Sequence, residues 1–145
     1  MTIDLTTALG NLPAEQNRFV GRERDLADLV AILGRVRALT LCGPGGIGKT
    51  RLALRLASLL APQYTDGAWI ADVADLDSNE ASGAEGDPVA AIERGGEPSR
   101  LVTLVTAAIG IRQEADRQLV DTLTESLRPR AMLLVLDTCE HMVAE

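Results

Sequence analysis

The chain has 145 residues, of which 46% are hydrophobic, and it carries a formal net charge of −7 with a pI near 4.7. This length suits one ordinary domain with a core of its own. An acidic chain without a basic patch repels nucleic acid, which excludes direct DNA binding by this segment. The sequence also has no apolar run of the roughly 20 residues that a membrane span needs.

Cysteine and histidine usage restricts the chemistry further. Cys42 and Cys139 are the only cysteines, and His141 is the only histidine. Two distant thiols and no signal peptide predict a reducing, cytoplasmic location without a structural disulfide or a membrane partner. We expect His141 to be a structural or surface residue rather than a metal ligand.

The first part of the chain leads into a helix. Residues 1–17 are polar and weakly patterned, and we interpret them as an N-terminal arm before a domain that covers residues 18–145. Phe19 and Val20 follow, then a glycine and an Arg-Glu pair that opens the helix. An apolar stripe at i, i+3, i+4 and i+7 gives this helix one core face, formed by Leu26, Leu29, Val30 and Leu33.

A glycine-rich loop follows an apolar run at residues 38–42, which we predict to be a strand. The loop occupies residues 43–50, reads G-x-x-x-x-G-K-T and has the Walker A pattern. In this pattern glycines let successive backbone N–H groups point at phosphate oxygens, and the next helix directs its positive end at the same anion. Lys49 supplies a charge for the phosphates, and the Thr50 hydroxyl can bind Mg²⁺.

The predicted nucleotide-binding residues of this region include Arg51, the first residue after the loop. Lys49 is the only lysine in the chain, which favours a specific role for it in binding and catalysis. Helical spacing of Leu52, Leu56, Leu59 and Leu60 then continues until Pro62. The candidate contacts are Gly43, Gly45, Gly46, Ile47, Gly48, Lys49, Thr50 and Arg51.

The second half of the chain alternates strands and helices. We predict strands at residues 68–73 and 131–136, helices at residues 101–110 and 116–127, and a long Gly-, Ser- and Pro-rich loop at residues 75–100. The apolar run at 131–136 is typical of a strand that is covered on both faces. It ends in Asp137, which gives the Walker B pattern and predicts a second Mg²⁺ ligand with a catalytic role.

Three motifs now stand in order: Phe19-Val20-Gly21-Arg22-Glu23, the glycine loop, and the strand that ends in Asp137. Together they resemble the NB-ARC-like nucleotide-binding domain of signal-transduction ATPases with numerous domains, as in LuxR- and AfsR-type bacterial transcriptional regulators. The resemblance implies an α/β P-loop NTPase sandwich in three layers with a mostly parallel sheet. It also implies an ATP/ADP-dependent switch, with Mg²⁺ as cofactor, in which Val20, Gly21 and Arg22 contact the base or ribose.

Two departures from the family pattern modify these expectations. Thr138 follows Asp137 where related ATPases carry Asn or a second acid, so Glu140 is the remaining candidate for a catalytic, water-orienting base, and any hydrolysis should be slow. In the family, the strand after Walker B inserts between the Walker A and Walker B strands, and the sequence ends at Glu145. The resemblance therefore implies a sheet that is incomplete at its C-terminal end and further domains of a full-length regulator as partners.

Two other functions remain open. A small P-loop kinase would need an acceptor site and an arginine-rich lid, for which Arg94 and Arg100 are the only hint. A truncated, non-catalytic interaction module would not need its Walker residues, yet Lys49, Thr50 and Asp137 are all intact.

Overall fold

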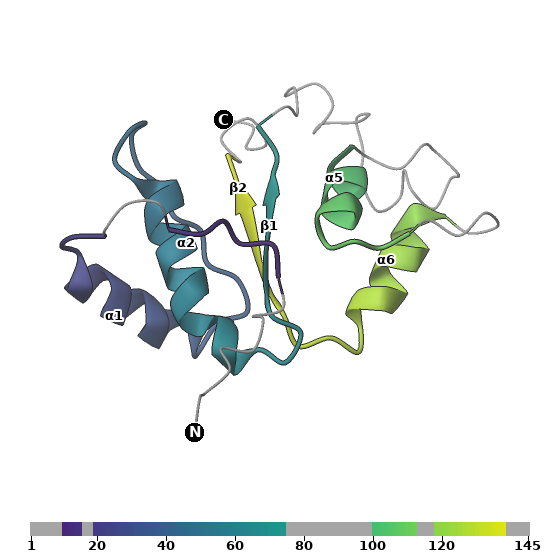
Figure 1. The fold of residues 1–145 in the computed structure, drawn as a ribbon, viewed down its shortest axis with the longest axis horizontal. Helices are drawn as coiled ribbons and strands as arrows, with labels where there is room; N and C mark the ends of the chain where they lie inside the picture. The colour runs from purple at the N-terminus through teal and green to yellow at the C-terminus, as the bar shows by residue number, and fades with distance from the viewer. Residues whose placement is uncertain (1–9, 16–18, 75–99, 113–117, 139–145) are drawn as a thin grey trace. The chain divides into compact units, whose positions relative to one another are not determined.

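The computed structural model describes residues 10–15, 19–74, 100–112 and 118–138. The chain has an α/β fold that is consistent with part of a P-loop NTPase fold, as predicted (Figure 1). The predictions made for residues 75–99, Cys139, Glu140 and His141 lie outside the described residues. In chain order the elements are α1 (Glu23–Leu33), α2 (Lys49–Leu60), the 3₁₀ helix η1 (Ala61–Gln63), β1 (Ala68–Asp72), α5 (Arg100–Ala108), α6 (Leu119–Leu127) and β2 (Leu133–Asp137).

The chain divides into two compact units. The first comprises residues 1–68 and 131–135, and it contains α1, α2 and η1. The second comprises residues 69–130 and 136–145, and it contains α5 and α6. Each strand of the sheet begins in the first unit and ends in the second.

Strands β1 and β2 pair in a parallel, two-stranded sheet. In the first unit the Leu133 amide donates to the Gly67 carbonyl at 3.0 Å, and in the second the Val73 amide donates to the Asp137 carbonyl at 3.1 Å. The strand predictions for residues 68–73 and 131–136 are therefore confirmed to within one or two residues. The predicted burial of the second strand on both faces is wrong, because β2 is half-buried and Leu136 is 40% exposed.

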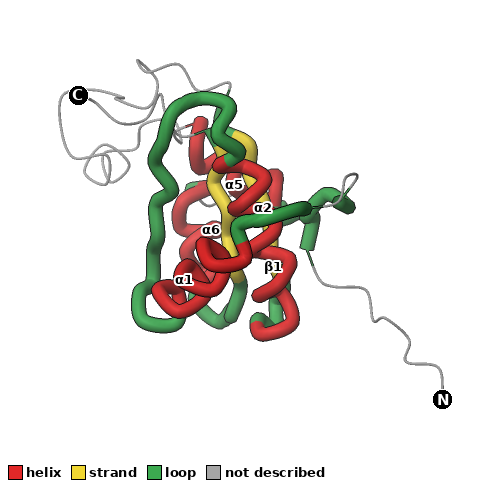
Figure 2. Tube along the Cα trace, turned by 90° about the vertical axis from the view of Figure 1, so that its left-hand side faces the viewer, coloured by secondary structure: helices red, strands yellow, loops and turns green. Residues whose placement is uncertain are grey.

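The strand predicted at residues 38–42 is absent. This stretch forms no strand, and the whole connection between α1 and α2 is drawn as loop in Figure 2. Leu39 and Leu41 are half-buried while Ala38, Thr40 and Cys42 are exposed. The burial of the side chains therefore alternates as in a strand, but the backbone does not pair with another strand of the described sheet. A strand is defined by its ladder, and the sheet within the described residues consists of β1 and β2.

The core of the first unit lies between α1 and α2, as their leucine stripes predict. Leu26 of α1 packs with three buried leucines of α2, and Phe19, Leu29, Val30, Leu33 and Leu41 pack against this cluster. The three leucines are Leu52, Leu56 and Leu60. Leu59, which we assigned to the same stripe, is instead 45% exposed.

In the second unit α5 packs against α6. Val105 and Ile109 are buried, as are Val73 and Leu119. Helix α5 ends at Ala108, two residues before the predicted end, and a Schellman motif closes it: the amides of Ile111 and Gly110 donate to the carbonyls of Thr106 and Ala107.

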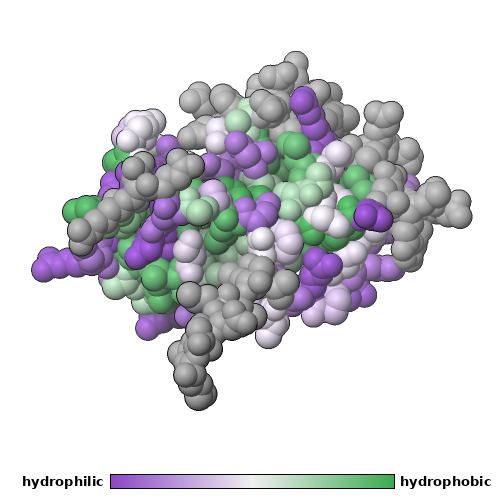
Figure 3. Space-filling view, viewed as in Figure 1, coloured by the Kyte–Doolittle hydropathy of each residue, from purple (hydrophilic) through white to green (hydrophobic). Residues whose placement is uncertain are grey.

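The surface is mixed in polarity. Among the coloured residues of Figure 3, apolar and polar side chains alternate over the face that is shown. No helix in the described part of the chain is long and apolar enough to cross a membrane.

Candidate functional site

The glycine loop turns the chain directly into helix α2. Gly46 and Gly48 have φ angles of 77° and 89°, a left-handed region that side chains disfavour. Gly48 is also the N-cap of α2. The glycine spacing of the motif is therefore required by the backbone of this turn.

The side chain of Lys49 folds back over the loop that precedes it. Its Nζ donates to the Gly43 carbonyl oxygen at 2.8 Å and lies 3.4 Å from the Pro44 carbonyl oxygen. The Ile47 amide also donates to the Pro44 carbonyl, at 3.4 Å. The only lysine of the chain thus lies at the glycine loop, where its ammonium group can donate hydrogen bonds to a phosphate.

The first turn of α2 adds further groups that suit an anion. Thr50 and Arg51 are both exposed there, so a hydroxyl-bearing and a guanidinium-bearing residue stand next to the loop. No acidic residue occupies this turn, and the positive end of the helix dipole is therefore not offset from within it. The loop and helix together fit a bound phosphate chain.

Two cavities of the first unit lie beside α2 and share Phe19. The smaller measures about 240 Å³ and the larger about 500 Å³. The smaller is lined by Pro13, Ala14, Glu15, Phe19, Arg51, Leu54 and Ser58. The larger is lined by Phe19, Gly21, Glu23, Leu26, Ala27, Val30, Arg55 and Leu59.

The predicted base contacts differ in where their residues lie. Gly21 lines the larger cavity, whereas Val20 lines neither cavity and is 82% exposed. Arg22 lines neither as well. It is the N-cap of α1 with a φ of 60°, and its Nε lies 3.7 Å from the Asp25 carboxylate.

Asp137 ends β2 in the second unit, where it is half-buried. Its carbonyl accepts the Val73 amide, and Thr138 after it has a φ of 62°, so the chain turns sharply at the end of the strand. Asp72 is likewise the last residue of its strand, β1, and its Oδ1 accepts the Ala74 amide at 3.0 Å. The described residues contain no group of three or more His, Cys, Asp or Glu side chains that could hold a metal by themselves.

Sequence reasoning missed two features of these sites. Asp72 follows an apolar strand just as Asp137 does, so the same pattern could have found it. The second feature is an ion pair in which Arg55 Nη1 of α2 lies 3.0 Å from Glu15 Oε2. These two residues are 40 positions apart, and no sequence pattern indicates their contact.

The sequence of the chain matches a family of known proteins over most of its length. A family described as "AAA ATPase domain" matches residues 18–143. The chain belongs to this family. AAA ATPase domains bind nucleotide, which agrees with the position of Lys49 over the glycine loop.

Two mycobacterial relatives are much longer proteins. An "Uncharacterized protein" of Mycobacterium tuberculosis is 30% identical over 125 residues, which are 86% of this chain and 27% of the relative. A "Putative HTH-type transcriptional regulator" of the same organism is 35% identical over 113 residues, which are 78% of this chain and 10% of the regulator. The chain therefore spans about a quarter and a tenth of the lengths of these two relatives. No solved structure matches it.

Proposed function

We propose that this AAA ATPase domain binds ATP and ADP with Mg²⁺ and acts as a nucleotide-dependent switch in a bacterial signalling or transcriptional regulator. The observation that carries the proposal is the contact of Lys49 with the glycine loop at the start of α2. The name of the 35% identical relative supports the regulatory context. The NB-ARC-like motifs at residues 19–23, 43–50 and 133–137 support the switch.

The phosphates bind at the loop in this proposal. Loop amides and the start of α2 supply neutral donors, and Lys49 supplies the charge. Because Lys49 Nζ already donates to the Gly43 carbonyl, binding exchanges this contact for one with a phosphate oxygen. Because only the flexible side chain of Lys49 has to move, this exchange needs no change in the fold.

The adenosine part binds beside α2, in the smaller cavity. Arg51 supports this choice, because it lines the smaller cavity and directly follows Thr50 of the loop. Phe19 and Leu54 offer apolar walls for the faces of the planar adenine ring, and Ser58 offers a hydroxyl for a polar atom at its edge. The NB-ARC-like motif implies Val20, Gly21 and Arg22 as further base or ribose contacts, although none of the three lines this cavity.

Mg²⁺ neutralises phosphate charge when it is bound, and oxygen ligands are what it prefers. We assign Thr50 and Asp137 to it from the Walker motifs. Hydrolysis is slow, because Thr138 rather than an acid adjoins Asp137, and a regulatory ATPase works by holding one state. Glu140 is the proposed water-orienting base, and Glu140→Gln should retain binding while lowering the rate roughly 100-fold.

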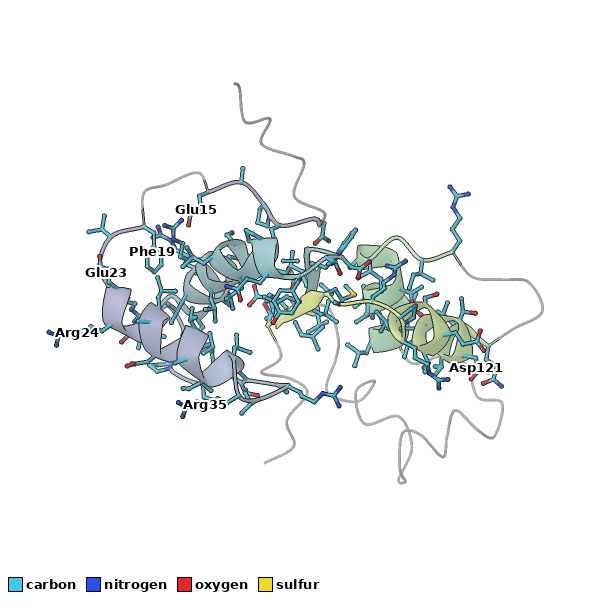
Figure 4. The ribbon with its side chains drawn as sticks, turned by 90° about the horizontal axis from the view of Figure 1, so that it is seen from below. Glu15, Phe19, Glu23, Arg24, Arg35 and Asp121 are labelled. Carbon is cyan, nitrogen blue, oxygen red and sulfur yellow. The ribbon has the colours of Figure 1, made fainter. Side chains whose placement is uncertain are left out.

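Titration with labelled ATP and ADP tests the proposal. Lys49→Ala should weaken binding by about 2–4 kcal/mol, which is roughly 30- to 700-fold. Arg24→Ala is the matched control, because Arg24 is exposed on α1 and points away from that helix in Figure 4. Equal affinities of the wild type and Lys49→Ala would refute the site. Fast turnover with a small-molecule acceptor would favour a kinase instead.

A further inference from the structure

The N-terminal segment (residues 10–15) is held against the rest of the first unit at several points. Gly10 forms a parallel bridge with Ala68, and a Cβ at Gly10 would collide with the Ala68 carbonyl oxygen. Leu12 packs against the cluster of Ala57, Ala61 and Ala68. The start of this segment is therefore fixed by backbone contact and apolar packing.

The end of the segment is fixed by charge. Arg55 Nη1 lies 3.0 Å from Glu15 Oε2, and the two side chains are 36% and 40% exposed. An ion pair that is open to solvent to this extent contributes little to the global free energy of unfolding. Its main effect is local, because it fixes where the Glu15 end of the segment lies relative to α2.

The ion pair also stands where the two cavities meet. Glu15 lines the smaller cavity, Arg55 lines the larger, and Phe19 lines both. Figure 4 shows Glu15 and Phe19 on the chain that precedes α1. The Nε atom of Arg55 is buried and has no hydrogen-bond partner among the described residues, while Nη1 of the same guanidinium donates to Glu15 Oε2.

We propose that Arg55 is a positioning residue for the nucleotide base. By holding Glu15, it keeps Pro13, Ala14 and Glu15 in place in the lining of the smaller cavity, to which α2 contributes Leu54 and Ser58. The inference rests on the proposed function, in which the base enters this cavity. Its consequence is specific: Arg55 affects ligands that carry a base and leaves a bare phosphate chain at the glycine loop unaffected.

A comparison of ATP with inorganic tripolyphosphate tests this separation. Arg55→Met keeps an unbranched side chain and removes the charge, so it should weaken ATP binding about tenfold by loosening a preorganised wall. Binding of tripolyphosphate should stay within about twofold, because the loop contacts are intact. The exchange Glu15→Arg with Arg55→Glu should restore most of the ATP affinity, and Arg24→Met should change neither ligand.

Amide hydrogen exchange of the nucleotide-free protein provides a readout without nucleotide. In Arg55→Met, the rate of amide hydrogen exchange at residues 11–15 should rise about tenfold, while the rate in α6 is unchanged. The double variant Glu15→Arg with Arg55→Glu should bring the rate at residues 11–15 back down. Unchanged exchange at residues 11–15 would overturn the inference. So would equal losses of ATP and tripolyphosphate affinity, because Arg55 would then act through the fold.

The proposed function fails in a different way. If the wild type binds neither ATP nor tripolyphosphate, the glycine loop is not a phosphate site, and the role of Arg55 in base binding falls with it. Lys49→Ala should lose both ligands, and its rate of amide hydrogen exchange at residues 11–15 should stay unchanged. This result would show that phosphate binding by Lys49 and positioning by Arg55 are separate roles.

Discussion

The glycine loop at residues 43–50 and the segment at residues 19–23 are both predicted to contact nucleotide. They differ in how far the sequence of each predicts its backbone conformation and the direction of its side chains. The left-handed backbone at Gly46 and Gly48 follows the glycine pattern, and Lys49 stands over the loop as the Walker motif implies. In the second segment Phe19 packs toward the core, while the neighbouring Val20 is 82% exposed. A motif that constrains the backbone thus specifies its geometry more fully than one that lists side-chain types.

The reason lies in the turn before α1. Gly21 and Arg22 have consecutive left-handed φ angles of 81° and 60°, and together they redirect the chain into the helix. Of the two residues before this turn, Phe19 packs on the core and Val20 is exposed. A left-handed arginine is costly and its conformation is not visible in the sequence, so the apolar pair alone left the choice open.

The largest expected effect concerns the glycine loop. Gly48→Val places a β-branched residue at a φ of 89°, and the strain should lower ATP affinity about 100-fold by displacing the loop amides. Titration of ATP into the purified variant measures this. Gly34→Ala is the matched control, because Gly34 has a φ of −65° and an added Cβ would meet only ordinary contacts.

If Gly48→Val bound ATP as tightly as the wild type does, the left-handed backbone at Gly48 would not be needed for binding. The glycine loop would then not differ from the segment at residues 19–23 in the way described above. Gly34→Ala should leave both binding and stability within about 0.5 kcal/mol, or stabilise slightly through the unfolded chain.

The second effect concerns Phe19. Phe19→Ala removes a ring that packs on the α1–α2 core and lines both cavities, so it should lower the free energy of unfolding by about 2 kcal/mol. Chemical denaturation followed by circular dichroism measures the change. A loss below about 0.5 kcal/mol would show that the ring contributes little to the core.

Other parts of the molecule show the same limit of prediction. The leucine stripes of α1 and α2 predict their packing because helical periodicity is local. Residues 38–42 have strand-like composition, but a strand needs a neighbour, and the pairing that the described residues show is β1 with β2. The Arg55–Glu15 contact joins residues 40 positions apart, so it depends on the folded chain rather than on any local pattern.

The third effect sharpens the proposed role of the strand ends. Asp137→Asn removes a charge that Mg²⁺ would prefer, so ATP affinity measured with Mg²⁺ should fall about tenfold. Affinity measured in excess chelator should be unchanged. Asp72→Asn at the end of β1 is the matched control, since an amide oxygen can still accept the Ala74 amide.

Equal losses in Asp137→Asn and Asp72→Asn would show that the acid at the end of β1 belongs to the metal site as well. Loss of affinity in chelator would instead assign Asp137 a structural role at the turn before Thr138.

The smallest expected effect decides whether the segment at residues 19–23 contacts the base through Val20. This side chain is 82% exposed, so Val20→Ala should change the free energy of unfolding by less than about 0.5 kcal/mol. A base that lies against Val20 would bury it on binding, and the truncation would then weaken ATP by a few-fold while leaving tripolyphosphate unaffected. Parallel titrations of the two ligands separate these cases. Because Val20 lines neither cavity, an ATP-specific loss would mean that bound nucleotide contacts a surface outside the cavity that we assign to the base.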